Sequence, residues 1–116
     1  LRVRRYSKHF LDFLYAADLS VSLAGYNTCM NLLVTKVPAL VYPYSRQQEQ
    51  PMRAEKIKNF IPMRILGEND VHPDMLCKHI EQMFQMTRAD SPLSLNLNGA
   101  DTAASILDRW INDSII

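Results

Sequence analysis

The sequence predicts an α/β fold, a parallel sheet with flanking helices in a Rossmann-like arrangement. Short apolar runs of strand length alternate with segments whose apolar residues recur at helical spacing, and this alternation is typical of parallel βαβ units. The run at residues 39–42 is almost continuously apolar, as expected of a strand that helices cover on both faces. A second run, at residues 19–23, leads through a glycine turn directly into a helical segment.

The first part of the chain is expected to hold two strands and two helices. Residues 1–5 can form a short strand that enters the domain. Ser7 is a candidate N-cap for a helix over residues 8–17, whose apolar residues share one face. Residues 19–23 are predicted to form a strand, and a helix over residues 27–35 follows the glycine turn.

The remaining elements are marked by proline and by apolar spacing. Pro51 fits the first turn of a helix that reaches Asn59. Residues 63–66 can form a short edge strand, and Pro73 begins another amphipathic helix. A last helix is predicted over residues 101–113, and its apolar residues include Ile106, Leu107, Trp110 and Ile111.

Length and composition favour a single soluble α/β domain over residues 1–116. The chain has 116 residues, 47% of them hydrophobic, and a formal net charge of +1, which implies no general attraction to nucleic acid. No run reaches the roughly 18 to 20 apolar residues of a membrane span, and no secretory signal is evident. Cys29 and Cys77 have no paired spacing, so we expect buried, reduced thiols and a cytoplasmic location.

A candidate phosphate site is formed by Ala24, Gly25, Tyr26, Asn27 and Thr28, between the predicted strand and helix. In this order, backbone N–H groups at the helix N-terminus can hold an anion such as a diphosphate. Gly25 permits a tight turn and close backbone approach, and Thr28 Oγ1 can add a hydrogen bond. The alternative is a plain strand-to-helix turn in which Asn27 or Thr28 serves only as a cap.

A candidate site for hydroxyl groups follows the next strand. Glu49 and Gln50 place a carboxylate and an amide side by side at a junction between loop and helix. A carboxylate accepts from two hydroxyls, and an amide both accepts and donates, which suits the rim of a sugar. The alternative is a solvated helix start, where the helix dipole favours an acidic residue. One segment for phosphate and one for hydroxyls together indicate a nucleotide-sugar pocket.

At these residues the chain resembles the C-terminal, donor-binding domain of GT-B glycosyltransferases. The likeness is to glycosyltransferase family 28, the family of bacterial lipid-linked N-acetylglucosaminyl transferases, and to a group of predicted glycosyltransferases related to it. The likeness covers most of the chain. It consists of several pieces whose order and spacing also match those of the family. These pieces are residues 10–18, residues 24–28, residues 37–40, Glu49-Gln50, Arg53-Ala54 and residues 95–100.

The resemblance implies a role for each candidate segment. Residues 24–28 would bind the donor diphosphate, and Glu49 and Gln50 would bind the donor sugar, which is expected to be linked to UDP. The residue six positions after the motif glycine is typically a glutamate that binds the ribose hydroxyls, and here it is Asn31. Tyr6 and Ser7 align with the segment that meets the base.

The resemblance also implies what this chain lacks. The first half of the donor-binding domain, with another glycine-rich loop, and the whole acceptor domain are expected to lie outside it. The catalytic base comes from that other domain, so no catalytic residue is expected here. The chain would bind the nucleotide-sugar as a substrate, without a cofactor, and would need an N-terminal acceptor domain or a partner subunit.

Other functions remain open at this point. A non-catalytic module, which binds nucleotide weakly or completes a partner, is the main alternative, because an amide at Asn31 binds a diol more weakly than a carboxylate does. A nucleotide-sugar epimerase ranks below it, since the acidic and histidine residues it would need are not in this segment. The histidines His9, His72 and His79 form no recognisable metal pattern, so no metal is expected.

Overall fold

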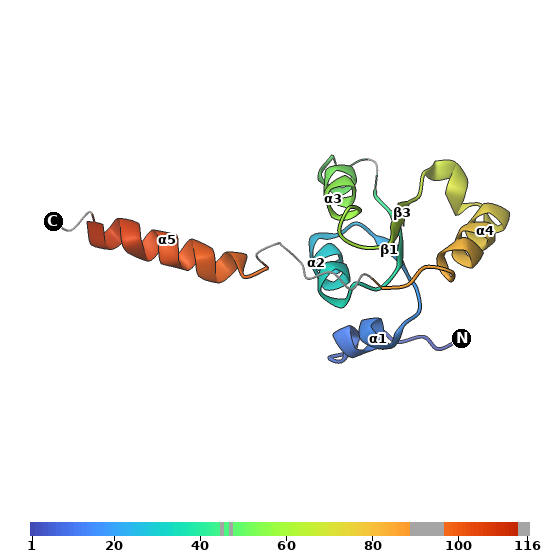
Figure 1. The fold of residues 1–116 in the computed structure, drawn as a ribbon, viewed down its shortest axis with the longest axis horizontal. Coiled ribbons are helices and arrows are strands. Elements are labelled where there is room, and N and C mark those ends of the chain that lie inside the picture. Colours follow the sequence, from blue (N-terminus) through green and yellow to red (C-terminus); the bar gives the residue numbers. More distant parts are fainter. Residues whose placement is uncertain (45, 47, 89–96, 114–116) are drawn as a thin grey trace.

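The computed structural model of the chain describes residues 1–44, 46, 48–88 and 97–113. Strands and helices alternate through most of it (Figure 1). In chain order the elements are α1 (Phe10–Ala16), β1 (Ser20–Leu23), α2 (Tyr26–Thr35), β2 (Ala39–Tyr42), α3 (Glu49–Ile57), β3 (Met63–Ile65), the 3-10 helix η1 (Glu68–Val71), α4 (Pro73–Met83) and α5 (Gly99–Asp113).

The three strands form one sheet in the order β1-β2-β3, and both pairs are parallel. Ser20 pairs with Ala39, and Ala39 pairs with Met63, so the three strands begin in line and end at one common edge. The connecting helices α2 and α3 lie on one side of the sheet and α4 lies on the other (Figure 1). The predicted Rossmann-like α/β fold is confirmed.

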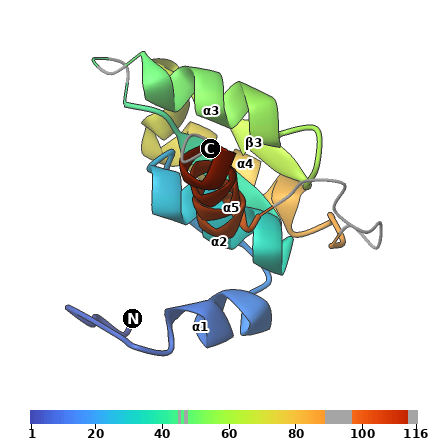
Figure 2. The same cartoon turned by 90° about the vertical axis from the view of Figure 1, so that its left-hand side faces the viewer.

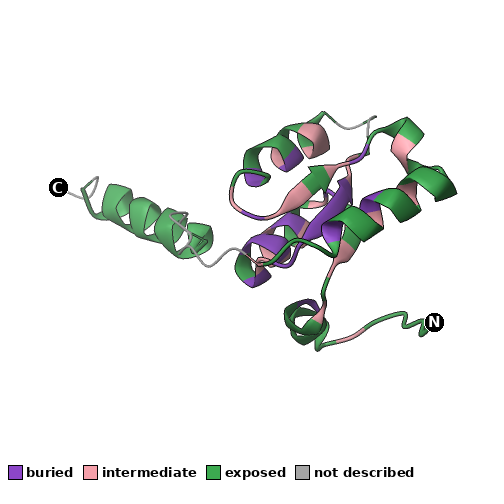
Figure 3. Ribbon diagram, turned by 45° about the vertical axis from the view of Figure 1, so that its right-hand side comes forward, coloured by how far each residue is buried: buried purple, intermediate pink, exposed green. Residues whose placement is uncertain are grey.

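The core surrounds β2, whose residues Ala39, Leu40 and Val41 have no solvent exposure (Figure 3). Successive side chains of a strand point to opposite faces, and the core is divided accordingly. On one face Ala39 and Val41 pack in a cluster with residues of α1, α2 and α3. On the other face Leu40 packs with Leu66 and Met83. The apolar run predicted to be covered on both faces is therefore covered on both faces.

The N-terminal segment differs from its prediction. Residues 1–5 form no strand, because three of the five are arginines and the apolar Leu1 and Val3 are fully exposed with no burial to favour pairing. The helix predicted over residues 8–17 is shorter, and its N-cap is His9. Ser7 does not cap it; its Oγ accepts a hydrogen bond from the His9 N–H at 3.1 Å.

Smaller differences concern helix ends and one cysteine. α3 begins at Glu49, so Pro51 does lie in its first turn, where no donor is needed. The 3-10 helix η1 has no counterpart in the sequence prediction, and α5 begins at Gly99, two residues early. Of the two thiols predicted to be buried, Cys29 is buried but Cys77 is exposed on α4, so the prediction for Cys77 was wrong.

Arg88 ties three parts of the fold together. Its guanidinium donates to the carbonyl oxygens of Thr35 at 2.6 Å, Leu14 at 3.0 Å, Tyr15 at 2.7 Å and Ala17 at 2.6 Å. These carbonyls lie at the C-terminal ends of α1 and α2, where no later N–H of the helix can satisfy them. A single cation therefore caps two helix ends and holds α1 beside α2.

We expect Arg88→Lys to lower the free energy of unfolding by about 2 kcal/mol, because one ammonium group cannot reach carbonyls that a planar guanidinium reaches together. Chemical denaturation monitored by circular dichroism measures this. Arg109→Lys is the matched control, since Arg109 is exposed on α5 and its loss should change stability by no more than about 0.5 kcal/mol. Equal effects of the two substitutions would contradict the role given to Arg88.

Candidate functional site

The two predicted binding segments meet where the sheet ends. Parallel strands direct their carboxyl ends to the same edge, and Ala24 follows β1 there as Pro43 follows β2. α2 begins at Tyr26, two residues after Ala24, and α3 begins after the loop that follows Pro43. The N-termini of both helices therefore lie at the edge where ligands of open α/β sheets bind.

The first segment forms a helix N-terminus with no side chain to cap it. Gly25 is the N-cap of α2 and its carbonyl oxygen accepts from the Cys29 N–H at 2.9 Å. No side-chain cap hydrogen bond is present, so neither Asn27 nor Thr28 serves as the cap that the alternative reading required. The N–H groups of the first turn have no acceptor within the helix, which is the condition for binding an anion.

Gly25 is not needed for the shape of the turn. Its backbone angles, φ −62° and ψ 152°, are extended and suit any residue, so the two-residue connection from β1 to α2 does not depend on the conformational freedom of glycine. Among the described residues, a Cβ atom built at this position would meet only Thr28 Oγ1, at an ordinary contact distance of 3.8 Å. What the glycine provides is open space beside the first turn of α2.

The second segment is organised by Gln50. Its side-chain Oε1 accepts from the Tyr44 N–H at 2.9 Å and so closes the loop between β2 and α3. Glu49 lies one residue earlier with its side chain 87% exposed. The amide thus shapes the start of α3, and the carboxylate faces solvent.

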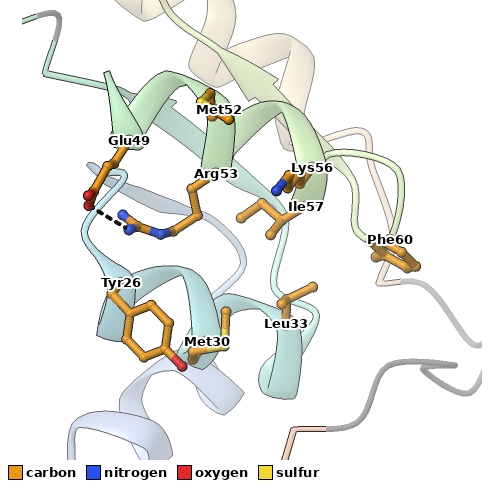
Figure 4. A pocket seen from close by; sticks show the side chains of 9 residues that line it. All are labelled: Tyr26, Met30, Leu33, Glu49, Met52, Arg53, Lys56, Ile57 and Phe60. Atoms are coloured by element: carbon orange, nitrogen blue, oxygen red, sulfur yellow. Dashed lines mark ion pairs between the residues drawn. The ribbon is translucent and has the colours of Figure 1, made fainter. Parts of the chain in front are cut away.

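Arg53 joins the two segments, and sequence reasoning gave it no role. From α3 it donates to the Ala24 carbonyl oxygen at 2.9 Å, pairs with Glu49 at 3.6 Å and lies over the Tyr26 ring at 5.6 Å from the centroid (Figure 4). Its side chain is 21% exposed. The spacing of four residues between Glu49 and Arg53 on one helix was the signal available in the sequence.

A groove of about 410 Å³ runs between α2 and α3 beside this contact (Figure 4). Most of its lining surface is apolar, and its lining includes Arg53 and two of the predicted site residues, Tyr26 and Glu49. The complete lining is Tyr26, Met30, Leu33, Glu49, Met52, Arg53, Lys56, Ile57 and Phe60. We refer to it as the α2/α3 groove.

The residues predicted to bind the ribose and the base do not line the α2/α3 groove. Asn31 is half-buried in α2, one turn after Asn27 and Thr28, and its carbonyl oxygen accepts from Thr35 Oγ1 at 2.8 Å. Tyr6 is exposed, and both it and Ser7 precede α1. Neither lines the α2/α3 groove, so the structure gathers the phosphate and sugar segments but not the base segment.

Each of the three histidines lies near a different carboxylate, and these contacts are at separate places in the fold. His79, almost fully buried, bridges Arg64 through Nδ1 and Asp70 through Nε2, at 2.9 Å for the latter. Hydrogen bonds from the Gly67 N–H and from His79 lower the pKa of Asp70. Within the described ranges, no three or more His, Cys, Asp or Glu residues are grouped as a metal site would require.

Burial raises the pKa of the Cys29 thiol, and the charge of Arg53 opposes this only in part. We therefore expect Cys29 to resist alkylation at neutral pH, while the exposed Cys77 reacts. Titration with a thiol reagent should count one fast thiol in the native chain and two after denaturation. Cys77→Ser should abolish the fast reaction; a fast reaction that persists in this variant would show that Cys29 is accessible.

The chain matches the glycosyltransferase family 28 C-terminal domain over residues 1–107 and belongs to this family. Its relatives include UDP-N-acetylglucosamine--N-acetylmuramyl-(pentapeptide) pyrophosphoryl-undecaprenol N-acetylglucosamine transferases. The one from Prochlorococcus marinus (strain NATL1A) is 29% identical over 103 residues, which are 87% of this chain and 29% of the relative. One from Bacillus thuringiensis (strain Al Hakam) is 27% identical over 99 residues, 83% of this chain and 28% of the relative.

The chain thus spans less than a third of the length of these relatives. No solved structure matches it. Among the helices that the structure describes, none is long and apolar enough to cross a membrane.

Proposed function

We propose that this chain binds a nucleotide-sugar donor, UDP-linked, as the donor-binding part of a glycosyltransferase. The diphosphate lies at the N-terminus of α2 and the sugar lies at the start of α3. Family membership supports the class of protein. The observation that carries the proposal is the position of Arg53, which contacts Ala24 of the first segment and Glu49 of the second.

The phosphate end of this site uses backbone donors. The N–H groups of Tyr26, Asn27 and Thr28 and the Thr28 hydroxyl hold the diphosphate oxygens, and the positive end of the helix dipole favours their charge. When the bond to the sugar breaks, negative charge grows on the diphosphate. Donors already fixed by a helix stabilise that charge without reorganising, which lowers the barrier to transfer.

The sugar end uses Glu49, whose exposed carboxylate accepts hydrogen bonds from two hydroxyls. Gln50 contributes as a sugar ligand and also fixes the loop through the Tyr44 N–H. Asn31 binds the ribose hydroxyls, and the segment at Tyr6 and Ser7 meets the base. These roles follow from the resemblance to the family.

A glycosyl transfer also needs a base that removes the proton from the acceptor hydroxyl. We assign it to an acceptor domain or partner subunit outside this chain, so that this chain alone binds donor and transfers nothing. A second candidate function is a non-catalytic nucleotide-binding or subunit-interaction module. The neutral amide at Asn31, in place of the carboxylate of the family, favours that candidate.

Gly25→Ala tests the phosphate end. The fold should tolerate the added Cβ, because it meets only Thr28 Oγ1 at 3.8 Å, but the methyl group occupies the space the diphosphate needs. We expect UDP affinity in calorimetric titration to fall about tenfold or more, with an unchanged melting temperature. Gly99→Ala is the control, since none of the residues that the structure describes lies within 4 Å of its added Cβ. Equal UDP affinity of wild type and Gly25→Ala would show that the diphosphate does not bind at this turn.

Glu49→Gln tests the sugar end separately. Loss of the carboxylate should weaken binding of UDP-hexoses by about tenfold or less without weakening binding of UDP itself, because UDP carries no hexose. Glu68→Gln, an exposed position on η1, is the control. If UDP and UDP-hexose lose affinity equally, Glu49 acts on the nucleotide and not on the sugar.

A further inference from the structure

The guanidinium of Arg53 lies beside the turn to which the proposed function assigns the diphosphate. The helices α2 and α3 are neighbours (Figures 1 and 2), and the Arg53 side chain lies between Glu49 and Tyr26 (Figure 4). Its Nη1 donates to the Ala24 carbonyl oxygen at 2.9 Å. Ala24 and Tyr26, the first residue of α2, are two positions apart, so their Cα atoms are separated by no more than about 8 Å. The cation is therefore close to the first turn of α2.

The charge of Arg53 acts on the start of α2. Burial raises the pKa of the Cys29 thiol in this helix, and the charge of Arg53 opposes that rise. The guanidinium also lies over the Tyr26 ring, 5.6 Å from its centroid. A positive charge here adds to the positive end of the helix dipole. Both favour the same kind of ligand, which is an anion.

The ion pair that Arg53 makes among the described residues is weak. Its side chain is only 21% exposed, and a cation so far removed from water needs an anionic partner. Glu49 Oε2 lies 3.6 Å from Nη2, beyond the roughly 2.7 to 3.2 Å of an N–H···O hydrogen bond. The Glu49 side chain is 87% exposed, so water screens the pair. An anion that enters the site can therefore displace Glu49 from Arg53.

We propose that Arg53 binds the diphosphate of the donor directly and leaves Glu49 when it does so. The Ala24 carbonyl oxygen keeps the guanidinium at the turn, while the Nη2 group that lies near Glu49 turns to a phosphate oxygen. A guanidinium has five N–H groups in a planar fork, which suits phosphate oxygens. This inference rests on the proposed function and adds a charged side chain to a phosphate end that otherwise uses uncharged donors.

NMR titration of the 116-residue chain with UDP and with uridine tests the role of Arg53. Arg53→Gln should lower the affinity for UDP about tenfold or more and leave the affinity for uridine unchanged, because uridine carries no phosphate. Glutamine can still donate to the Ala24 carbonyl oxygen, so the variant should fold. Arg53→Lys keeps the charge without the planar fork and should recover part of the lost UDP affinity.

Lys78→Gln is the matched control, because it removes the same charge from an exposed position on α4, on the other side of the sheet. It should change the affinity for UDP by no more than about twofold, since solvent and salt screen a distant exposed charge.

The side-chain Nε–H signal of Arg53 reports the contact itself. This signal, assigned through its absence from the spectrum of Arg53→Lys, should shift on addition of UDP and stay in place on addition of uridine. An unchanged UDP affinity in Arg53→Gln, an equal loss for UDP and uridine, or a signal that UDP does not shift would overturn this inference and leave the proposed function standing. A wild-type chain that binds no UDP would overturn both.

Discussion

The parallel pairing of β1, β2 and β3 is the constraint on which the rest of the structure depends. Ala39, Leu40 and Val41 are buried completely, so β2 must be covered from both faces and has one possible place, at the centre of the sheet. Parallel neighbours require crossover helices, and these helices begin where the strands end. The N-termini of α2 and α3 are therefore brought to one edge by the burial of a four-residue strand.

Much of this arrangement could be predicted from local pattern. Residues 39–42 were predicted with the bounds of β2, and the strand-glycine-helix order located α2 to within one residue. Local pattern could not find contacts between distant residues. Arg88 donates to carbonyls 53 and 74 residues away, and no periodicity or motif marks such a residue. The strand predicted at residues 1–5 is absent for a related reason. A strand needs a neighbouring strand to pair with, and its own sequence does not reveal whether one is present.

The candidate site, too, could be predicted only in part from the sequence. That residues 24–28 and Glu49 would lie together follows from the topology of a parallel sheet, and they do. Gly25 was expected to permit a tight turn and a close backbone approach; its angles are ordinary, and the structure shows open space beside it. Arg53 was visible as a spacing to Glu49, but its bond to Ala24, 29 residues earlier, is a tertiary contact.

The pairing of Arg53 with Glu49 bears on how such a site would distinguish its ligands. In this structure the guanidinium, mostly shielded from solvent, is balanced by an exposed carboxylate. A diphosphate that competes for Arg53 would leave Glu49 without its partner, which costs interaction energy unless something else binds the carboxylate. Sugar hydroxyls supply that replacement. A ligand that carries both a diphosphate and a sugar would give Arg53 and Glu49 each a new partner. UDP would give a new partner to Arg53 alone. Under the proposed function, the arrangement would therefore favour a nucleotide-sugar over the nucleotide that remains after transfer.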